Sequence, residues 1–168
     1  MNEASCGSRV RRRQALILVA AVAGIVLLAA CGGGSSGSSG AHASTYIYWA
    51  NSNGSTIGRA DLNGTGVNQR FITGIGPSMV AVTSRYIYWA SGSSTIGRAD
   101  LNGAAVNQRF ITGADMPDAL TVDSRYVYWA NWGNGTIGRA SLDGSGVNQR
   151  FITVRRGRPV GVAVDSGP

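Results

Sequence analysis

The sequence predicts an all-β fold built from one small unit that occurs three times. Residues 46–50, Tyr-Ile-Tyr-Trp-Ala, return at 86–90 and, with valine for isoleucine, at 126–130, so the spacing is 40 residues both times. A Thr-Ile-Gly-Arg-Ala segment follows each copy, and Val-Asn-Gln-Arg-Phe-Ile-Thr then begins at Val67, Val106 and Val147. Self-similarity at such a period is typical of repeat architectures.

Each repeat carries the signals of four short strands joined by tight turns. The Tyr-Ile-Tyr-Trp run is aromatic and β-branched, which favours a strand. The next run, residues 55–62, ends at an Asn-Gly pair, which is a strong hairpin signal. A third strand is expected from Asn68 to Thr73, and a glycine- and proline-containing loop then leads to a fourth at residues 80–82. A helical alternative is disfavoured because no copy shows a period of 3.6 residues.

Four-stranded units at a period of about 40 residues fit the blades of a β-propeller. A small sheet with two apolar faces is not stable alone in water, so neighbouring blades are expected to stack face to face. The glycine of each Ile-Gly-Arg segment then marks a place where a neighbouring sheet or a Trp ring approaches the backbone closely. These glycines are Gly58, Gly97 and Gly138.

The repeated residues resemble a known family. Tyr-Trp-Ala-Asn, then Ile-Gly-Arg-Ala-Asp-Leu-Asn-Gly, then Pro before Val-Ala-Val is similar to the YWTD-type (low-density-lipoprotein-receptor class B) propeller repeat and its bacterial lipoprotein versions. The resemblance covers Tyr46 to Asp165 and implies a six-bladed ring. The chain departs from the pattern at its threonine, which is alanine here, and at its aspartate, which is Asn51, Ser91 or Asn131. A hydrogen-bond network made by those family groups therefore does not carry over directly.

The strand inventory leads to an expectation about assembly. The first repeat begins at a second strand, and the chain ends after a first strand, Val160 to Asp165, so twelve strands make three blades with one blade shared between the ends. Closed propellers typically have four to eight blades. We therefore expect a homodimer in which the last strand of each chain completes the first blade of the other, giving a six-bladed ring. An open three-blade arc is the alternative.

Residues 1–30 have the pattern of a lipoprotein signal peptide. Four arginines between residues 9 and 13 precede an apolar run at 15–30, which meets Cys31. This run is shorter than the roughly 20 residues of a spanning helix, although an uncleaved anchor stays open. The junction Leu-Ala-Ala-Cys resembles a bacterial lipobox, which implies acylation of Cys31 and anchoring on the exported face of the bacterial cell membrane. Both Sec and twin-arginine export remain open.

The remainder divides into a tether and a domain. Residues 31–44 comprise the lipidated cysteine and a Gly- and Ser-rich tether, a composition typical of flexible linkers. Residues 45–168 form the three-repeat domain. The formal net charge of the whole chain is +7, and removal of four arginines and one glutamate with residues 1–30 leaves eleven arginines against seven aspartates, or +4. A nucleic-acid partner is not expected, because that would need a broader basic face.

The sequence does not predict an enzyme. Its only histidine, His42, lies in the tether and its only glutamate, Glu3, in the signal peptide, so the domain lacks a base for a serine nucleophile. Asp115 and Asp118 flank Pro117 but make a weak cation site without further ligands. We therefore expect no metal and no cofactor. A degenerate lyase-type propeller enzyme is the less favoured alternative.

Binding residues are sought among those that break the repeat, because function resides in sites grafted onto a fold. Trp132 sits in a polar loop, where it could stack on a sugar, anchor a protein partner or pack over the next blade. The candidate set is Trp132, Asn131, Asn134, Arg155, Arg156 and Arg158. The predicted function is a non-catalytic protein- or glycan-binding module on a surface lipoprotein. A structural scaffold of the cell envelope is the second hypothesis.

Overall fold

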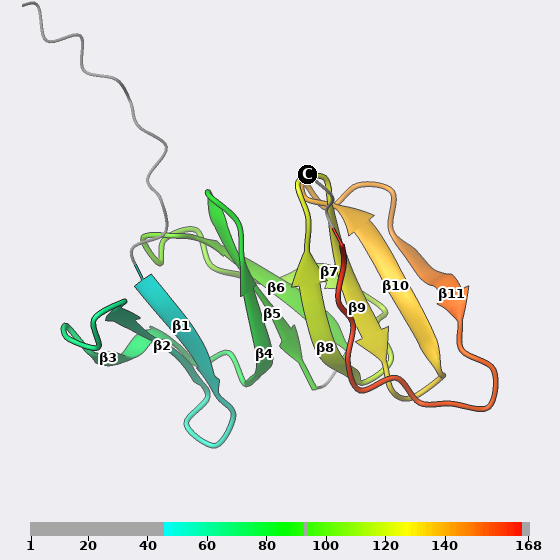
Figure 1. The fold of residues 1–168 in the computed structure, drawn as a ribbon, viewed down its shortest axis with the longest axis horizontal. Coiled ribbons are helices and arrows are strands. Elements are labelled where there is room, and N and C mark those ends of the chain that lie inside the picture. The colour runs from blue at the N-terminus through cyan, green and yellow to red at the C-terminus, as the bar shows by residue number, and fades with distance from the viewer. Residues whose placement is uncertain (1–45, 93, 166–168) are drawn as a thin grey trace, which may run out of the picture. The chain divides into compact units, whose positions relative to one another are not determined.

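The computed structural model describes residues 46–92 and 94–165, and the predicted signal peptide, Cys31 and tether lie outside them. The described residues are all-β, and none of them belongs to a helix that could cross a membrane. The strands are β1 (Tyr46–Asn51), β2 (Thr56–Asp61), β3 (Asn68–Thr73), β4 (Pro77–Val82), β5 (Tyr86–Ser91), β6 (Thr95–Asp100), β7 (Asn107–Thr112), β8 (Pro117–Val122), β9 (Tyr126–Asn131), β10 (Thr136–Ser141) and β11 (Asn148–Thr153) (Figure 1).

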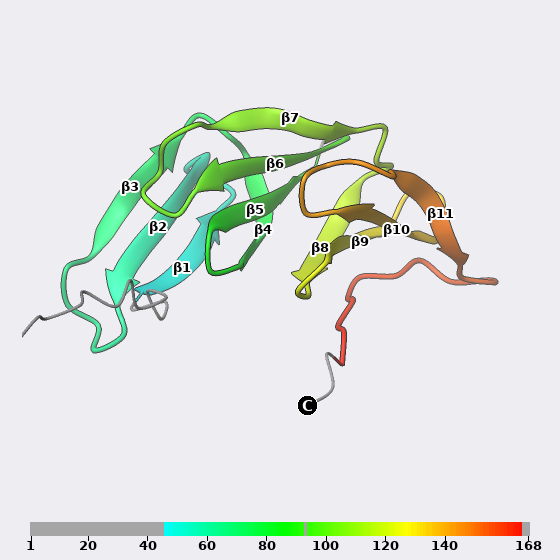
Figure 2. The same cartoon turned by 90° about the horizontal axis from the view of Figure 1, so that it is seen from above.

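The strands form three antiparallel sheets, which confirms the predicted blades. Blade 1 is β1-β2-β3, blade 2 is β4-β5-β6-β7, and blade 3 is β8-β9-β10-β11, so strands that follow one another in the chain lie side by side in each sheet (Figure 2). The three blades form an open series rather than a closed ring. Blades 2 and 3 each begin with a strand that blade 1 lacks among the described residues.

The Trp-Gly pairs explain the repeated Ile-Gly-Arg segments. Each glycine lies opposite the Trp of the neighbouring strand, as Gly97 does opposite Trp89. A Cβ atom on Gly97 would lie 2.1 Å from Trp89 Cε2. A Cβ atom on Gly58 or Gly138 would lie 2.2 Å from Cε2 of Trp49 or Trp129, respectively. The prediction of a close approach is confirmed, and the ring that approaches belongs to the same blade. The next strand pair shifts register at each of these glycines.

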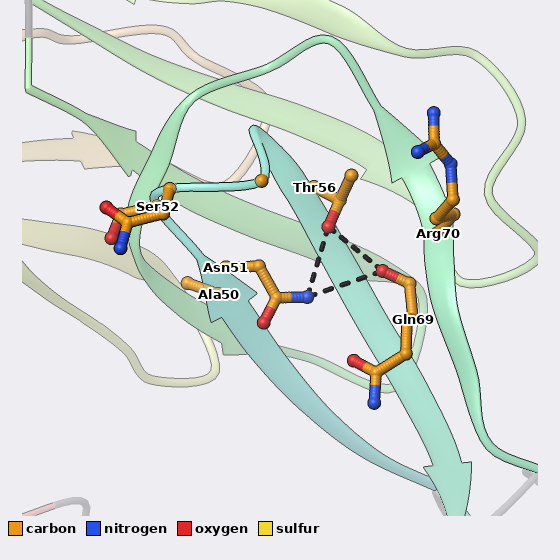
Figure 3. Close-up of a pocket in the computed structure, with 8 residues that line it drawn as sticks. Ala50, Asn51, Ser52, Thr56, Gln69 and Arg70 are labelled. Carbon is orange, nitrogen blue, oxygen red and sulfur yellow. Dashed lines mark hydrogen bonds between the residues drawn. The ribbon is translucent and has the colours of Figure 1, made fainter.

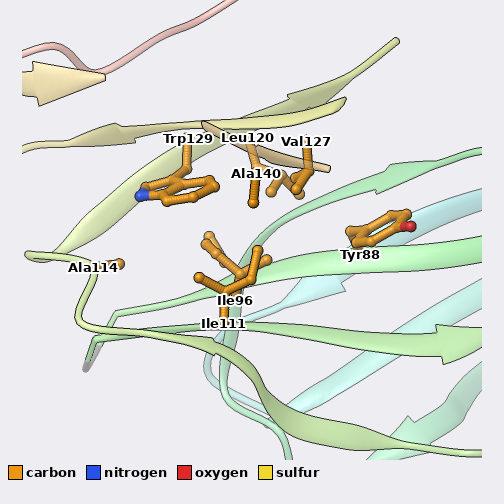
Figure 4. Packing of buried hydrophobic residues seen from close by; sticks show 9 residues of the cluster. Tyr88, Ile96, Ile111, Ala114, Leu120, Val127, Trp129 and Ala140 are labelled. Carbon is orange, nitrogen blue, oxygen red and sulfur yellow. The ribbon is translucent and has the colours of Figure 1, made fainter. Parts of the chain in front are cut away.

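Apolar clusters join the blades. Between blades 1 and 2, Trp89 and Ile87 of β5 pack with Ile57 of β2 and Ile72 of β3. The interface of blades 2 and 3 repeats this arrangement: Figure 4 shows Trp129, Val127, Leu120 and Ala140 of blade 3 facing Ile96, Ile111 and Tyr88 of blade 2. Burial of one large apolar side chain contributes about 1.5–3 kcal/mol. The Trp and Ile side chains of a second strand thus pack against the preceding blade.

The expectation of a last strand at Val160 to Asp165 is wrong for this structure. Residues 157–165 run as an extended segment beside blade 3 without forming a strand (red in Figure 2). The reason is the absence of a neighbour: β4 and β8 pair with β5 and β9, which follow them in the chain. Within the described residues no strand follows residue 165, so this segment has no backbone ladder to join.

Candidate functional site

Three loops meet at one end of blade 3 and bring most of the candidate residues together. Trp132 N donates to Met116 O at 3.2 Å and Gly133 N donates to Asp115 O at 3.0 Å, which ties the β9–β10 turn to the loop before β8. Val154 N donates to Gly135 O at 2.8 Å and ties in the segment after β11. We call residues 113–116, 132–135 and 154–158 the loop face.

Trp132 and Arg158, both candidates from the sequence, are in contact. The Arg158 guanidinium lies 4.2 Å from the centroid of the Trp132 ring, a cation–π distance worth about 0.5–1 kcal/mol at an exposed site. The half-buried ring also borders a shallow pocket of about 270 Å³. The residues around this pocket are Ser78, Gly92, Met116, Pro117, Asp118 and Trp132.

Met116 is a functional candidate that the set above omits. It is half exposed and has a φ of 49°, in the left-handed region. Its counterpart before the proline of β4 is Gly76, with a φ of 48°, and a side chain in this conformation costs on the order of 1 kcal/mol or more. The sequence signal was the replacement of this glycine by methionine before Pro117. An exposed apolar side chain is therefore held in a strained turn beside Trp132.

Asn131 is a correction to the candidate set. Its side chain is fully buried, where Nδ2 donates to Thr136 Oγ1 at 3.0 Å and to Gln149 O at 3.1 Å, and Oδ1 accepts from Asp115 N at 2.9 Å. A buried amide with these partners does not contact a ligand, so Asn131 supports the loops instead. Asn134 is exposed, and its Oδ1 accepts from Thr136 Oγ1 at 2.7 Å.

Blade 1 carries the same amide arrangement at a pocket of about 570 Å³ (Figure 3). Asn51 Nδ2 donates to Thr56 Oγ1 at 3.0 Å and to Gln69 O at 3.3 Å, and Thr56 Oγ1 donates to Gln69 O at 2.9 Å. The asparagine that ends the second strand of the repeat thus links the strands within one blade. In blade 3 the counterpart of Gln69, Gln149, donates from Nε2 to Thr112 O of blade 2 at 2.7 Å. The blade 1 pocket therefore opens on the side where a preceding blade would pack.

The arginines of the segment after β11 are exposed on the loop face. Arg156, with a φ of 58°, and Arg158 border a third shallow pocket of about 410 Å³ together with Asn134. Arg155 is also exposed but does not line this pocket. Among residues 46–92 and 94–165 there is no group of three or more His, Cys, Asp or Glu side chains that could hold a metal ion.

The carboxyl group of Asp123 lies in the β8–β9 turn, at the other ends of these strands from the loop face, and its contacts are structural. Burial disfavours its charged form, but hydrogen bonds from Arg125 N at 2.7 Å, Tyr126 N at 2.6 Å and Tyr128 OH at 3.0 Å outweigh burial and lower the Asp123 pKa. Burial and the Asp123 contact raise the pKa of Tyr128. Thr83 accepts the equivalent backbone bonds in blade 2. The lowered pKa of Asp123 therefore results from hydrogen bonds that stabilise the β8–β9 turn. The equivalent turn in blade 2 is stabilised in the same way by the uncharged Thr83.

Comparisons with known proteins agree on the fold. No protein-family model and no curated protein matches the chain. Similar solved structures include a nidogen/laminin complex (21% identity, TM-score 0.60), hydrazine synthase of Kuenenia stuttgartiensis (17%, 0.60) and virginiamycin B lyase from Staphylococcus aureus (21%, 0.56). Each match covers 69–70% of this chain but only 47%, 35% and 41% of the other, respectively, so the chain spans less than half of each. At these identities the likeness shows the β-propeller fold alone.

Proposed function

We propose that this chain is a non-catalytic β-propeller module that binds a protein partner through the loop face around Trp132. The observation that carries the proposal is the cluster of Trp132, Arg158 and Met116. The half-buried Trp132 ring lies 4.2 Å from the Arg158 guanidinium, and it borders the same pocket as Met116, which is half exposed in a strained turn. Trp, Arg and Met are enriched in the cores of protein interfaces, and Trp and Arg dominate binding hot spots.

A protein fits this surface better than a glycan. Met116 and Pro117 give the pocket beside Trp132 an apolar wall, and Arg158 already covers part of the ring that a sugar would stack on. One of the similar solved structures is of a nidogen/laminin complex, which is consistent with protein binding on this fold. The repeat residues also support membership in the YWTD-type propeller family.

Peptide and glycan arrays probed with the purified chain test this function. We expect reproducible binding to peptides that falls at least tenfold in Trp132→Ala, because Trp is enriched among binding hot spots, whose truncation costs about 2 kcal/mol or more. Val106→Ala is the control, because Val106 is also an exposed apolar side chain but lies just before β7 in blade 2, away from the loop face. Binding to glycans but not to peptides would contradict the protein partner and indicate a glycan ligand. Silence on both arrays would favour the envelope scaffold.

We also propose that Cys31 is acylated and holds the module on the exported face of the bacterial membrane. The support is the lipobox-like junction after the apolar run 15–30, and stable anchoring takes more than one acyl chain. Cells fed a labelled fatty acid should label the wild-type chain and Cys6→Ser, which alters the signal peptide only. Cys31→Ser should lose the label and leave the membrane fraction. Equal labelling of all three chains would refute the anchor.

A further inference from the structure

Among residues 46–92 and 94–165, no strand pairs with the outer edge of β1 on the leading side of blade 1. There β1 pairs with β2 alone, whereas its counterparts β5 and β9 are each flanked by a first strand, β4 or β8. The effect on side chains is large: Ile47 of β1 is 53% exposed, but Ile87 and Val127 at the same repeat position are fully buried. Blade 1 therefore presents an apolar edge that elsewhere in this structure is always covered.

The trailing side of blade 3 is uncovered in the same way. Ile152 of β11 is 49% exposed, whereas its counterparts Ile72 and Ile111 are 4% and 2% exposed because the next blade packs on them. Phe151 beside it is also exposed. The series of blades thus ends on an apolar face at one end and begins on an apolar edge at the other.

The segment after β11 already lies where the first strand of a next blade belongs. Alignment of Pro159 with Pro77 and Pro117 places Val162 at the position of Val80 and Leu120. Leu120 packs against blade 2 in the interface described above. Val162 likewise packs against Ala119, Ala130 and Ile137 of blade 3. Residues 159–164 therefore lie where the first strand of a next blade belongs, and no second strand pairs with them among the described residues.

The two open ends match each other by residue type and position. Inside the structure, Ile87 and Trp89 of one blade pack against Ile57 and Ile72 of the preceding blade. The counterparts of the first pair are Ile47 and Trp49 on the leading side of blade 1, and those of the second pair are Ile137 and Ile152 on the trailing side of blade 3. Within the chain, the trailing side of one blade packs against the leading side of the next. The leading side of blade 1 therefore carries the residues that fit the trailing side of blade 3.

We propose that two copies of this chain associate head to tail, with residues 159–165 of each copy pairing with β1 of the other. The β4–β5 and β8–β9 ladders fix the register, because Val82 pairs with Ile87, Val80 with Trp89, and Val122 with Val127. Val164 of one copy then lies opposite Ile47 of its partner, and Val162 opposite Trp49. Two identical contacts close a ring with twofold symmetry.

Further contacts follow from the same equivalence. Gln149 of blade 3 donates to Thr112 O of blade 2, so Gln69 of blade 1, beside its open pocket, would donate to Thr153 O of the partner copy. We favour a second copy of this chain as the partner of the β1 edge. The same sequence supplies both this edge and the segment at 159–165 that matches it in register. A strand from elsewhere would have to reproduce that match.

Disulfide trapping in the full chain tests the register. In blade 2, Thr83 N donates to Tyr86 O at 2.9 Å, so the next pair along the ladder, Val82 and Ile87, is a non-hydrogen-bonded pair with Cα atoms about 4.5 Å apart. That separation suits a disulfide. Two differently tagged full-length chains, one with Ile47→Cys and one with Val164→Cys, are produced in the same cells and oxidised. We expect a covalent dimer that carries both tags and separates on reduction.

The matched control is Val160→Cys in place of Val164→Cys. Residue 160 lies four positions off the register, about 13 Å along the strand, so it should not link to residue 47. Each cysteine variant produced alone should also give no dimer. A full chain with both Ile47→Cys and Val164→Cys should give a dimer. An internal link within one chain, or a ladder of higher multimers, would overturn the two-copy ring.

A second experiment needs no variant. The unmodified full chain is released from detergent in a native mass spectrometer, and the mass of the particle is measured. Two copies per particle are the expected result. A single copy, or any other number of copies, would refute the proposal even if the cysteine variants failed to fold.

Discussion

At the residue scale the three repeats are internal controls, because one residue type recurs in different surroundings. Each blade stacks an arginine between a tyrosine and a phenylalanine at 4.0–4.3 Å from their ring centroids. Such stacking is a property of arginine's planar guanidinium that lysine does not share. The arginine, tyrosine and phenylalanine that all repeats share therefore have a structural role. Binding residues are sought among those that differ between the repeats.

Gly97→Ala should destabilise the protein, because the added methyl group would meet the Trp89 ring at 2.1 Å. Trp89 is fully buried between blades 1 and 2 and has no space into which it can move. Overpacking of this kind costs about 1–3 kcal/mol. The midpoint of urea unfolding should fall accordingly. Gly92→Ala is the control, since nothing lies within 4 Å of the added atom and its unfolding midpoint should stay close to that of the wild type.

The low pKa of Asp123 should make part of the stability depend on pH. Burial opposes the charged form, but two backbone N–H groups and Tyr128 OH hold the folded-state pKa below its unfolded value of about 3.9. The stabilisation is therefore complete above about pH 4 and is lost as the pH falls through the lower folded pKa. Urea unfolding of the wild type between pH 2 and 7 should show this loss.

Asp123→Thr is the matched variant for this prediction, because Thr83 accepts the same two backbone bonds in blade 2 without a charge. It should remain close to wild-type stability at pH 7 and lose less stability than the wild type below pH 4. Identical acid profiles for the two proteins would mean that Asp123 does not contribute to the pH dependence.

At the element scale, blade 3 depends on an amide that joins β9 to β10 and β11. Asn131 Nδ2 bridges Thr136 Oγ1 and Gln149 O, and Asn131 Oδ1 holds the N–H of Asp115 in the β7–β8 loop. The strands of the blade and the loop face are thus fixed by one buried side chain. Backbone pairing alone would leave the loop without this link.

Asn131→Ala should lower the unfolding free energy by about 1–3 kcal/mol, because the partly buried N–H of Asp115 and the acceptors around the Asn131 amide would lose their partner. Asn131→Ser, which introduces the residue that blade 2 carries at this position, should lose less. Asn134→Ala is the control in the same turn, because Asn134 is exposed and water can replace its bond. Equal unfolding midpoints for Asn131→Ala and Asn134→Ala would contradict the bridging role.

The strands could be predicted from the sequence because their signals are local. The surroundings of individual side chains could not be predicted where they depend on tertiary contacts. The repeated aromatic runs placed the second strand of each blade, and the Asn-Gly or Asp-Gly turns placed the hairpins that follow, because those residues favour strands and hairpins by themselves. The valine-rich run at 160–164 was also predicted as a strand, but no strand pairs with it among the described residues. Trp132 was identified because it breaks the repeat. The burial of Asn131 was not predictable, because Asp115, whose N–H it accepts from, lies 16 residues away in the chain.

At the scale of the whole molecule, the blades are unequally covered. Blade 2 has a neighbour on both sides, and its β5 side chains from Ile87 to Ala90 are fully buried. Blade 1 and blade 3 each expose one apolar side, with Ile47 and Ile152 at its centre. Local opening should therefore be easier at β1 and at residues 159–165 than at their counterparts in blade 2, which have a strand neighbour that these segments lack among the described residues.

Hydrogen exchange at two protein concentrations links this uneven coverage to assembly. If β1 pairs with residues 159–165 of a second copy, both segments should exchange slowly in concentrated solution and quickly after dilution, because association stabilises by mass action. β5 and β9 have strands on both sides within one chain, so their exchange should not respond to dilution. β1 amides that exchange quickly at every concentration would show that its outer edge stays open. Slow exchange that survives dilution would instead require a partner strand within the same chain.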